Sequence, residues 1–125
     1  MKIRIDPLDT IFSQYIRMRA MKSVHGCERC LTAKVSYKQL QCSHFIGRGR
    51  KSTRWDEDNA AGLCFGCHSH FTAHPLEHVE WFKERLGDKF NLLQARVRTP
   101  GRYIDKASIK LYLQAKIKGM TSLLP

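Results

Sequence analysis

The clearest pattern of hydrophobic and polar positions is helical and lies near the start of the chain. After Pro7, apolar residues recur at every third or fourth position: Leu8, Ile11, Phe12, Tyr15 and Ile16. This spacing lines one face of an α-helix, and Asp9 or Thr10 would cap its first turn. It predicts a helix over residues 8–21.

Residues 34–45 show a different pattern, a partial alternation of apolar and polar positions that is typical of one or two short strands. The run RGRKSTR follows, and its glycine and its charges predict an exposed loop. Helices are predicted again over residues 77–86, between Pro75 and Gly87, and over residues 105–118, beyond the break at Thr99-Pro100-Gly101.

Helices at both ends with a short hairpin between them predict an α+β fold. We treat residues 1–125 as one domain with three parts: an N-terminal helix (1–22), a core that holds most of the cysteines and histidines (23–75) and a C-terminal helical part (76–125). At this length a metal staple adds usefully to a modest hydrophobic core.

The net charge of the chain favours one class of binding partner. The 22 Lys and Arg residues against 11 Asp and Glu give a formal charge of +11, which favours nucleic acid, with an anionic membrane surface as the weaker alternative. No stretch approaches the roughly 18 to 20 apolar residues of a membrane span, and the start MKIRIDPLDT lacks the apolar core of an export signal. We therefore expect a cytoplasmic protein with no membrane partner.

Four of the five cysteines form two pairs, Cys27-x-x-Cys30 and Cys64-x-x-Cys67, separated by 33 residues. Two such pairs suit one tetrahedral zinc ion, and four thiolates leave no open position for water, so this zinc would be structural. The odd number of cysteines and the expected cytoplasmic location argue against disulfides. Cys42 stands outside the pairs; we favour core packing for it over a role as a fifth ligand or a reactive thiol.

Three further residues stand in register with these pairs: His44, Asn59 and His68, spaced His-x14-Asn-x8-His. With the segments CSHF, DNAAGLC and CHSHF, framed by the two CxxC pairs, the chain resembles the HNH (ββα-metal) endonucleases. The resemblance implies a zinc-stapled ββα-metal core flanked by N- and C-terminal helices, and a metal-dependent DNA endonuclease.

A closer resemblance runs over nearly the whole chain. The segments FSQYIRMR, SHF, TRWDEDN, LCFGCHSH and EWFKERLG are similar to those of the NinG/Rap recombination endonucleases of lambdoid phages. That family cuts branched DNA such as Holliday junctions and D-loops. The resemblance implies branched DNA as substrate, a bacteriophage setting inside a bacterial host, and phage or host recombination proteins as possible partners.

Phosphodiester hydrolysis needs a base for water, a cation for the developing charge and groups that hold both in place. His44 is the expected base, because an imidazole titrates near neutral pH. Asn59 is expected to hydrogen-bond backbone and so orient the histidine loop. His68, directly after a zinc ligand on a helix, is the expected ligand of a catalytic Mg²⁺ or Mn²⁺, and its nitrogen suits manganese better.

The sequence offers fewer obvious candidates for the other ligands of that metal. Many HNH relatives supply ligands directly before the base and four residues after the last histidine, where this chain has Ser43 and Thr72. Among the side chains that could complete the shell, we favour His70. Phosphate oxygens and water are alternatives, as are Asp56, Asp58 and His74.

Between His44 and Asn59 lies a dense basic run: Arg48, Arg50, Lys51 and Arg54. We expect it to contact DNA phosphates, with further Lys and Arg residues such as Arg96 and Arg102 widening the footprint. For Trp55, packing in the core is favoured over stacking on a base.

Two other functions stay open. One is a zinc-stapled DNA-binding module with little or no catalysis, which the short metal shell favours. The other is an HNH nicking endonuclease with no preference for branched DNA. A homodimer is possible, because symmetric resolution of a four-way junction needs two active sites.

Overall fold

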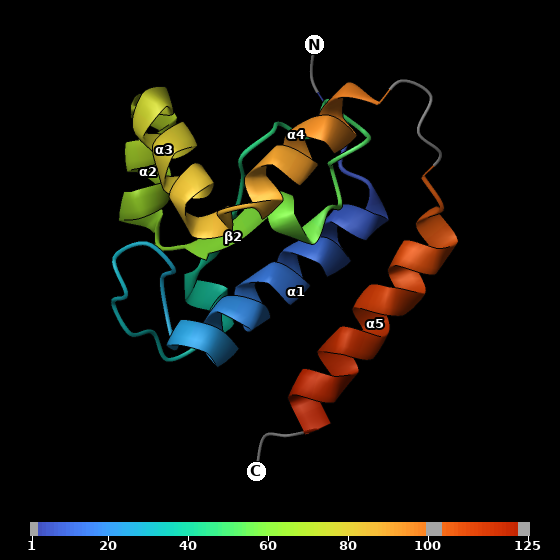
Figure 1. The fold of residues 1–125 in the computed structure, drawn as a ribbon. Coiled ribbons are helices and arrows are strands. Elements are labelled where there is room, and N and C mark those ends of the chain that lie inside the picture. Colours follow the sequence, from blue (N-terminus) through green and yellow to red (C-terminus); the bar gives the residue numbers. More distant parts are fainter. Residues whose placement is uncertain (1–2, 100–103, 123–125) are drawn as a thin grey trace.

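The computed structural model describes residues 3–99 and 104–122 (Figure 1). Within these residues two short strands stand among five helices, which confirms the predicted α+β class. Arg102, Pro100 and Gly101 lie outside the described residues. The elements are α1 (Pro7–Val24), the 3-10 turn η1 (Tyr37–Gln39), β1 (Gln41–His44), the 3-10 turn η2 (Glu57–Asn59), β2 (Ala60–Leu63), α2 (Phe65–Ala73), α3 (Pro75–Leu86), α4 (Lys89–Arg98) and α5 (Lys106–Ser122).

Helix α1 confirms the helix predicted over residues 8–21. Its cap, however, is Asp6, whose carboxylate accepts a hydrogen bond from the Leu8 amide at 2.8 Å. Asp9, at the third helical position, accepts one in return from the Asp6 amide at 2.8 Å. This reciprocal capping box, with Pro7 in the first turn, fixes the start of the helix.

The sheet is a two-stranded antiparallel hairpin, in which Gln41 pairs with Leu63 and His44 with Ala60. The stretch 34–45 contributes β1 alone, and the second strand lies further along the chain, at β2. All four residues of β2 are buried, so it lacks the alternation by which β1 was predicted. Gly62 lets β2 lie against α1, since a Cβ there would stand 2.7 Å from that of Ala20.

The core has two clusters that meet at α1 and β2. One packs the end of α1 and the β2 residues Ala61 and Leu63 against α2, α3 and α4, with Phe71 and Phe82 among its buried rings. The other packs the start of α1 against Trp55, Ala60 and Leu113 of α5. Helix α5 therefore lies alongside α1 (Figure 1), and β2 contributes residues to both clusters.

The C-terminal part holds one helix that the sequence did not predict. The predicted helices at 77–86 and 105–118 are present as α3 and α5, and α4 stands between them. Phe90, Leu93 and Val97 recur at helical spacing in α4, so the sequence held a signal for this helix that the prediction missed; Phe90 and Leu93 are the residues of α4 that are buried. No helix within the described ranges is both long enough and apolar enough to cross a bilayer.

Candidate metal centre and histidine pocket

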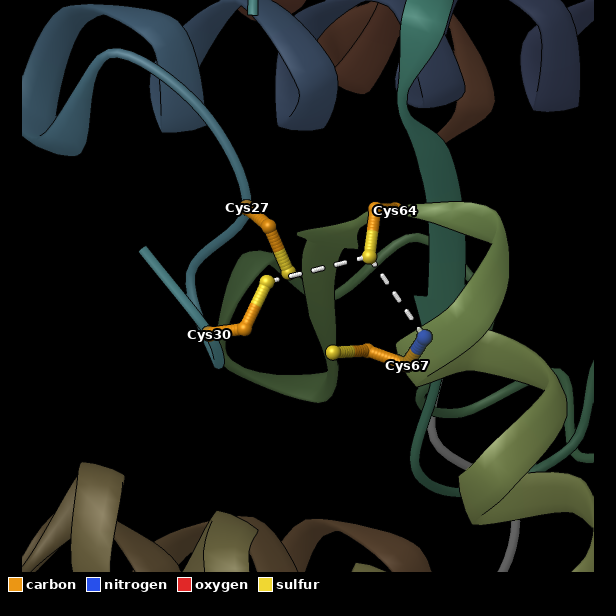
Figure 2. A group of neighbouring side chains, drawn as sticks. All are labelled: Cys27, Cys30, Cys64 and Cys67. Atoms are coloured by element: carbon orange, nitrogen blue, oxygen red, sulfur yellow. Dashed lines mark hydrogen bonds between the residues drawn. The ribbon is translucent and has the colours of Figure 1, made fainter. Parts of the chain in front are cut away.

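The side chains of the two cysteine pairs point toward one another (Figure 2). Cys27 and Cys30 lie on the loop after α1, Cys64 caps α2, and Cys67 lies in the first turn of that helix. Their four sulfurs all lie within 4.8 Å of one another, and those of Cys30 and Cys64 are 3.8 Å apart. A tetrahedral ion with Zn–S bonds of about 2.3 Å requires sulfurs about 3.8 Å apart. The donor set and its spacing therefore fit one structural zinc.

The loop that carries the first pair is folded tightly. The Cys27 amide donates to the Thr32 carbonyl at 3.2 Å, and the Leu31 amide donates to the Cys27 carbonyl at 2.9 Å. Leu31 takes a left-handed conformation (φ 61°), which a branched side chain adopts only at a cost. A Cβ on Gly26 would lie 2.0 Å from the Thr32 carbonyl oxygen, so this position requires glycine.

Two charged side chains attach this loop to the rest of the core. Glu28 accepts hydrogen bonds from the Gly62 amide of β2 at 2.6 Å and from the Arg85 guanidinium of α3 at 2.8 Å. Arg29 lies over the ring of Phe71 and places a guanidinium nitrogen 3.5 Å from the Cys67 sulfur. Its positive charge offsets part of the negative charge that four thiolates bring to a divalent ion.

A pocket of about 400 Å³ opens between α1, β1 and α2 and brings together residues from distant parts of the sequence. We name it the histidine pocket. It is lined by Asp9, Ser13, Cys42, His44, Gly47, Arg48 and His68. Two of the three predicted catalytic residues, His44 and His68, therefore face one cavity.

His44 is the last residue of β1, and two contacts hold its imidazole ring. Its Nε2 lies 3.2 Å from the backbone carbonyl oxygen of Arg54, and its ring lies 5.6 Å from that of Phe12. A carbonyl oxygen only accepts, so Nε2 carries the proton and Nδ1 keeps the lone pair. Burial lowers the pKa of His44 below the ordinary 6.5, with the positive charge of Arg48 acting in the same direction. The ring is therefore a neutral base at neutral pH.

Asn59 is fully buried, is not among the residues that line the pocket, and holds the loop that follows β1. Its Oδ1 accepts from the Ile46 amide at 2.7 Å, and its Nδ2 donates to the carbonyls of Ile46 at 2.9 Å and Thr53 at 3.0 Å. These bonds tie the two ends of the loop together. The expectation that Asn59 hydrogen-bonds backbone around the histidine is confirmed.

His68 approaches the pocket from α2. Its Nδ1 hydrogen-bonds the side-chain oxygen of Gln41 on β1. Because that oxygen accepts, Nδ1 carries the proton and Nε2 keeps a lone pair. A metal ligand oriented by a second hydrogen bond has this arrangement.

The pocket offers few other donors for a metal. Within the described residues, groups of three or more close donor atoms occur at the four cysteines and at His70, His74 and Glu77, not in the pocket. Ser43 is buried and Thr72 donates to the His68 carbonyl, so neither joins His68 in the pocket. The pocket itself thus supplies one imidazole nitrogen suited to a metal, His68 Nε2, beside the base.

The prediction that His70 shares an ion with His68 has to be corrected. His70 lies two positions further along α2, a rotation of about 200° on the helix, and faces Glu77 with Nε2 and Oε2 2.9 Å apart. The alternatives Asp56 and Asp58 accept hydrogen bonds from Arg96 at 2.5 and 3.1 Å. These contacts also remove Arg96 from the expected DNA footprint.

The basic loop is only in part available to DNA. Arg50 and Lys51 are exposed, and Arg48 lines the pocket with its guanidinium 3.9 Å from the Asp9 carboxylate. Arg54 is buried and donates to both oxygens of Asp9, at 3.0 and 2.6 Å. The prediction that Arg54 contacts DNA is therefore wrong, because its charge is paired inside the protein.

Asp9 is the charged pocket residue that sequence reasoning missed as part of the site. Burial alone would raise its pKa, but hydrogen bonds from Arg54, the Asp6 amide and the Trp55 indole outweigh this and hold the pKa at about 2. The capping pattern marked Asp9 only as a possible helix cap. No local signal relates it to an arginine 45 residues away.

The structure around the pocket also bears on the predictions for Trp55 and Cys42. Trp55 is buried in the core, with its indole N–H donating to Asp9 at 2.9 Å, as favoured over stacking on a base. Cys42 packs against the second core cluster at the pocket wall, and burial raises the pKa of its thiol to about 12. A thiol that stays protonated is a poor nucleophile, so packing is the better account of Cys42.

Compared with models of protein families, with curated proteins and with solved structures, the chain matches none.

Proposed function

We propose that this chain is a metal-dependent DNA endonuclease of the HNH type, built on a zinc-stapled ββα core. The observation that carries the proposal is the state of His44. Its Nε2 is held by a backbone carbonyl, its Nδ1 keeps the lone pair, and it shares a pocket with His68 and Arg48 beside the four-cysteine cluster.

The roles follow from the contacts. His44 Nδ1 takes a proton from the water that attacks phosphorus, and burial keeps the ring neutral for this task. Asn59 holds the loop that supplies the Arg54 carbonyl and so positions the base. His68 Nε2 would hold a magnesium or manganese ion, which would supply charge neutralisation at the phosphate, and phosphate oxygens and water would be its other ligands.

The basic loop supports a polyanionic substrate. Arg48 stands at the pocket wall, and Arg50 and Lys51 are exposed on the same loop, where they would contact phosphates on either side of the scissile bond. Branched DNA is the preferred substrate because of the resemblance to the NinG/Rap endonucleases. Two copies would cut a four-way junction symmetrically, in the bacterial cytoplasm with phage or host recombination proteins as partners.

One gel experiment tests the proposal. The parent protein is incubated with a four-way junction, a linear duplex and a single strand of the same sequence, each with Mg²⁺ or Mn²⁺. We expect cleavage of the junction in preference to the other two. Equal cleavage of all substrates would indicate a nicking endonuclease without structural preference.

A second function has one observation in its favour: the histidine pocket supplies a single imidazole suited to a metal. Binding to the junction without cleavage in either metal would establish a zinc-stapled DNA-binding module instead of an enzyme.

The salt dependence of binding tests the footprint in either case. Each phosphate contact contributes a slope of roughly 0.9 in log K against log salt on B-DNA. Reversing Arg48 and Arg50 to Glu should flatten the slope. Reversing Lys116 and Lys118 on α5 changes the net charge equally and should have a smaller effect; the opposite order would move the footprint to α5.

A further inference from the structure

The junction between α2 and α3 gathers three metal-binding side chains outside the histidine pocket. His70 lies in the last turn of α2, His74 is the residue between the two helices, and Glu77 lies in the first turn of α3. Pro75 starts α3 directly after His74, so the chain turns there without a loop. One donor atom from each of the three lies within 4.8 Å of the other two.

The present contacts of these side chains show what a cation would replace. His70 Nε2 donates to Glu77 Oε2 at 2.9 Å, so the proton on this nitrogen lies in a hydrogen bond shared with the carboxylate oxygen. His74 Nδ1 donates to the His70 carbonyl at 2.8 Å, which leaves Nε2 of His74 with its lone pair. The two imidazole rings stack 4.1 Å apart. An ion at this point displaces the shared proton and needs a turn of the His74 ring.

The side chains are free enough to make that adjustment. Their exposed fractions are 34% for His70, 52% for His74 and 51% for Glu77. Exposure also leaves room for water as a fourth ligand. Two imidazoles with one carboxylate suit zinc and its first-row neighbours, whereas Mg²⁺ prefers a shell made of oxygen.

We propose that His70, His74 and Glu77 form a second zinc site, separate from the four-cysteine cluster and from the histidine pocket. The four thiolates already complete a tetrahedral shell, and His68 points to the other side of α2. An ion here clamps the end of α2 to the start of α3. Helix α2 would then be held by metal at both ends, with His68 between them.

Calorimetric titration tests the site without reference to cleavage. Protein that carries one zinc per chain is titrated with zinc chloride, and with cobalt chloride for spectra. We expect a second equivalent to bind, and the cobalt bound there to lack the thiolate-to-metal absorption that a cysteine site would give. His74→Ala and Glu77→Gln should each weaken this second equivalent by more than about tenfold.

Two controls make the outcome decisive. His25→Asn removes another exposed histidine and should leave the second equivalent unchanged, as should His68→Ala. The proposal is overturned if no second equivalent binds up to millimolar zinc. It is also overturned if the second equivalent survives His74→Ala, or is lost with His68→Ala, since either result places the ion elsewhere.

Discussion

The Nε2 atom of His44 lies 3.2 Å from the backbone carbonyl oxygen of Arg54, and this contact links the imidazole to a buried ion pair. The side chain of Arg54 is held by both oxygens of Asp9 in α1. The peptide that fixes the tautomer of His44 is thereby anchored from the first helix of the chain. The orientation of the proposed base depends on α1 as much as on the hairpin.

The rate of cleavage should depend on pH through His44. Burial lowers its pKa, so the neutral, basic form persists below the ordinary value of 6.5. The single-turnover rate should rise with pH as His44 loses its proton, with a midpoint below pH 6.5. Because the charge of Arg48 also lowers this pKa, Arg48→Gln should move the midpoint upward. A midpoint well above 6.5 in the parent would contradict this account of the base.

Asp9→Asn should destabilise the protein by about 3 kcal/mol at pH 7, because it leaves the buried Arg54 guanidinium without its carboxylate. The native pKa of about 2 lies below the ordinary 3.8, so the ionised carboxylate contributes stability above about pH 4. That contribution, about 2 kcal/mol, is lost as the pH falls through about 2.

Urea denaturation of Asp9→Asn and the parent at pH 7 and at acid pH measures this loss. Asp88→Asn, at an exposed carboxylate that makes no capping hydrogen bond, is the matched control and should be nearly neutral. If Asp9→Asn unfolds at the same urea concentration as the parent at pH 7, the ion pair does not hold the pocket together.

Cys64→Ser should lose the structural zinc and most of the folded state, because a structural zinc contributes on the order of 10 kcal/mol in small zinc peptides. Elemental analysis and circular dichroism measure the two effects. Cys42→Ser, outside the cluster, should keep about one zinc per chain. A folded Cys64→Ser protein with unaltered melting would show that the four cysteines hold no structural metal.

Gly26→Ala should disrupt the cysteine loop, since its Cβ would lie 2.0 Å from the Thr32 carbonyl oxygen. We expect a lower melting temperature and weaker zinc retention against a chelator. Gly66→Ala is the matched control: apart from its chain neighbours and the backbone of its own helix, no atom lies within 4 Å of the added Cβ, and alanine favours the helix by up to about 1 kcal/mol. Equal behaviour of the two variants would mean that the close approach at Gly26 is not required.

The features that the sequence predicted well are those with a local signal. Short segments of the sequence contain both the apolar period of α1 and the two CxxC spacings. The structure has the helix and the four-cysteine cluster that these patterns predict. The convergence of His44 and His68 on one pocket required more, namely a resemblance that aligns distant segments.

The features that the sequence did not predict depend on contacts with other residues of the chain that no local pattern reveals. Arg54 looks like its neighbours Arg50 and Lys51, yet pairing with Asp9 removes it from the surface. In the sequence His70 lies close enough to His68 to suggest that both bind one metal. Two positions on a helix, however, place His70 on the opposite side of α2, where it hydrogen-bonds Glu77.

The most direct test of the central claim compares His44→Ala with the parent on the same four-way junction, in Mg²⁺ and in Mn²⁺. We predict a loss in cleavage rate of about 10² to 10⁴, with zinc content and junction affinity unchanged, because the imidazole moves a proton and holds neither the fold nor the phosphate. His68→Ala should also lose cleavage but regain part of it as manganese is raised. Cleavage by His44→Ala at the parent's rate would contradict the assignment of the base and, with it, the proposed mechanism.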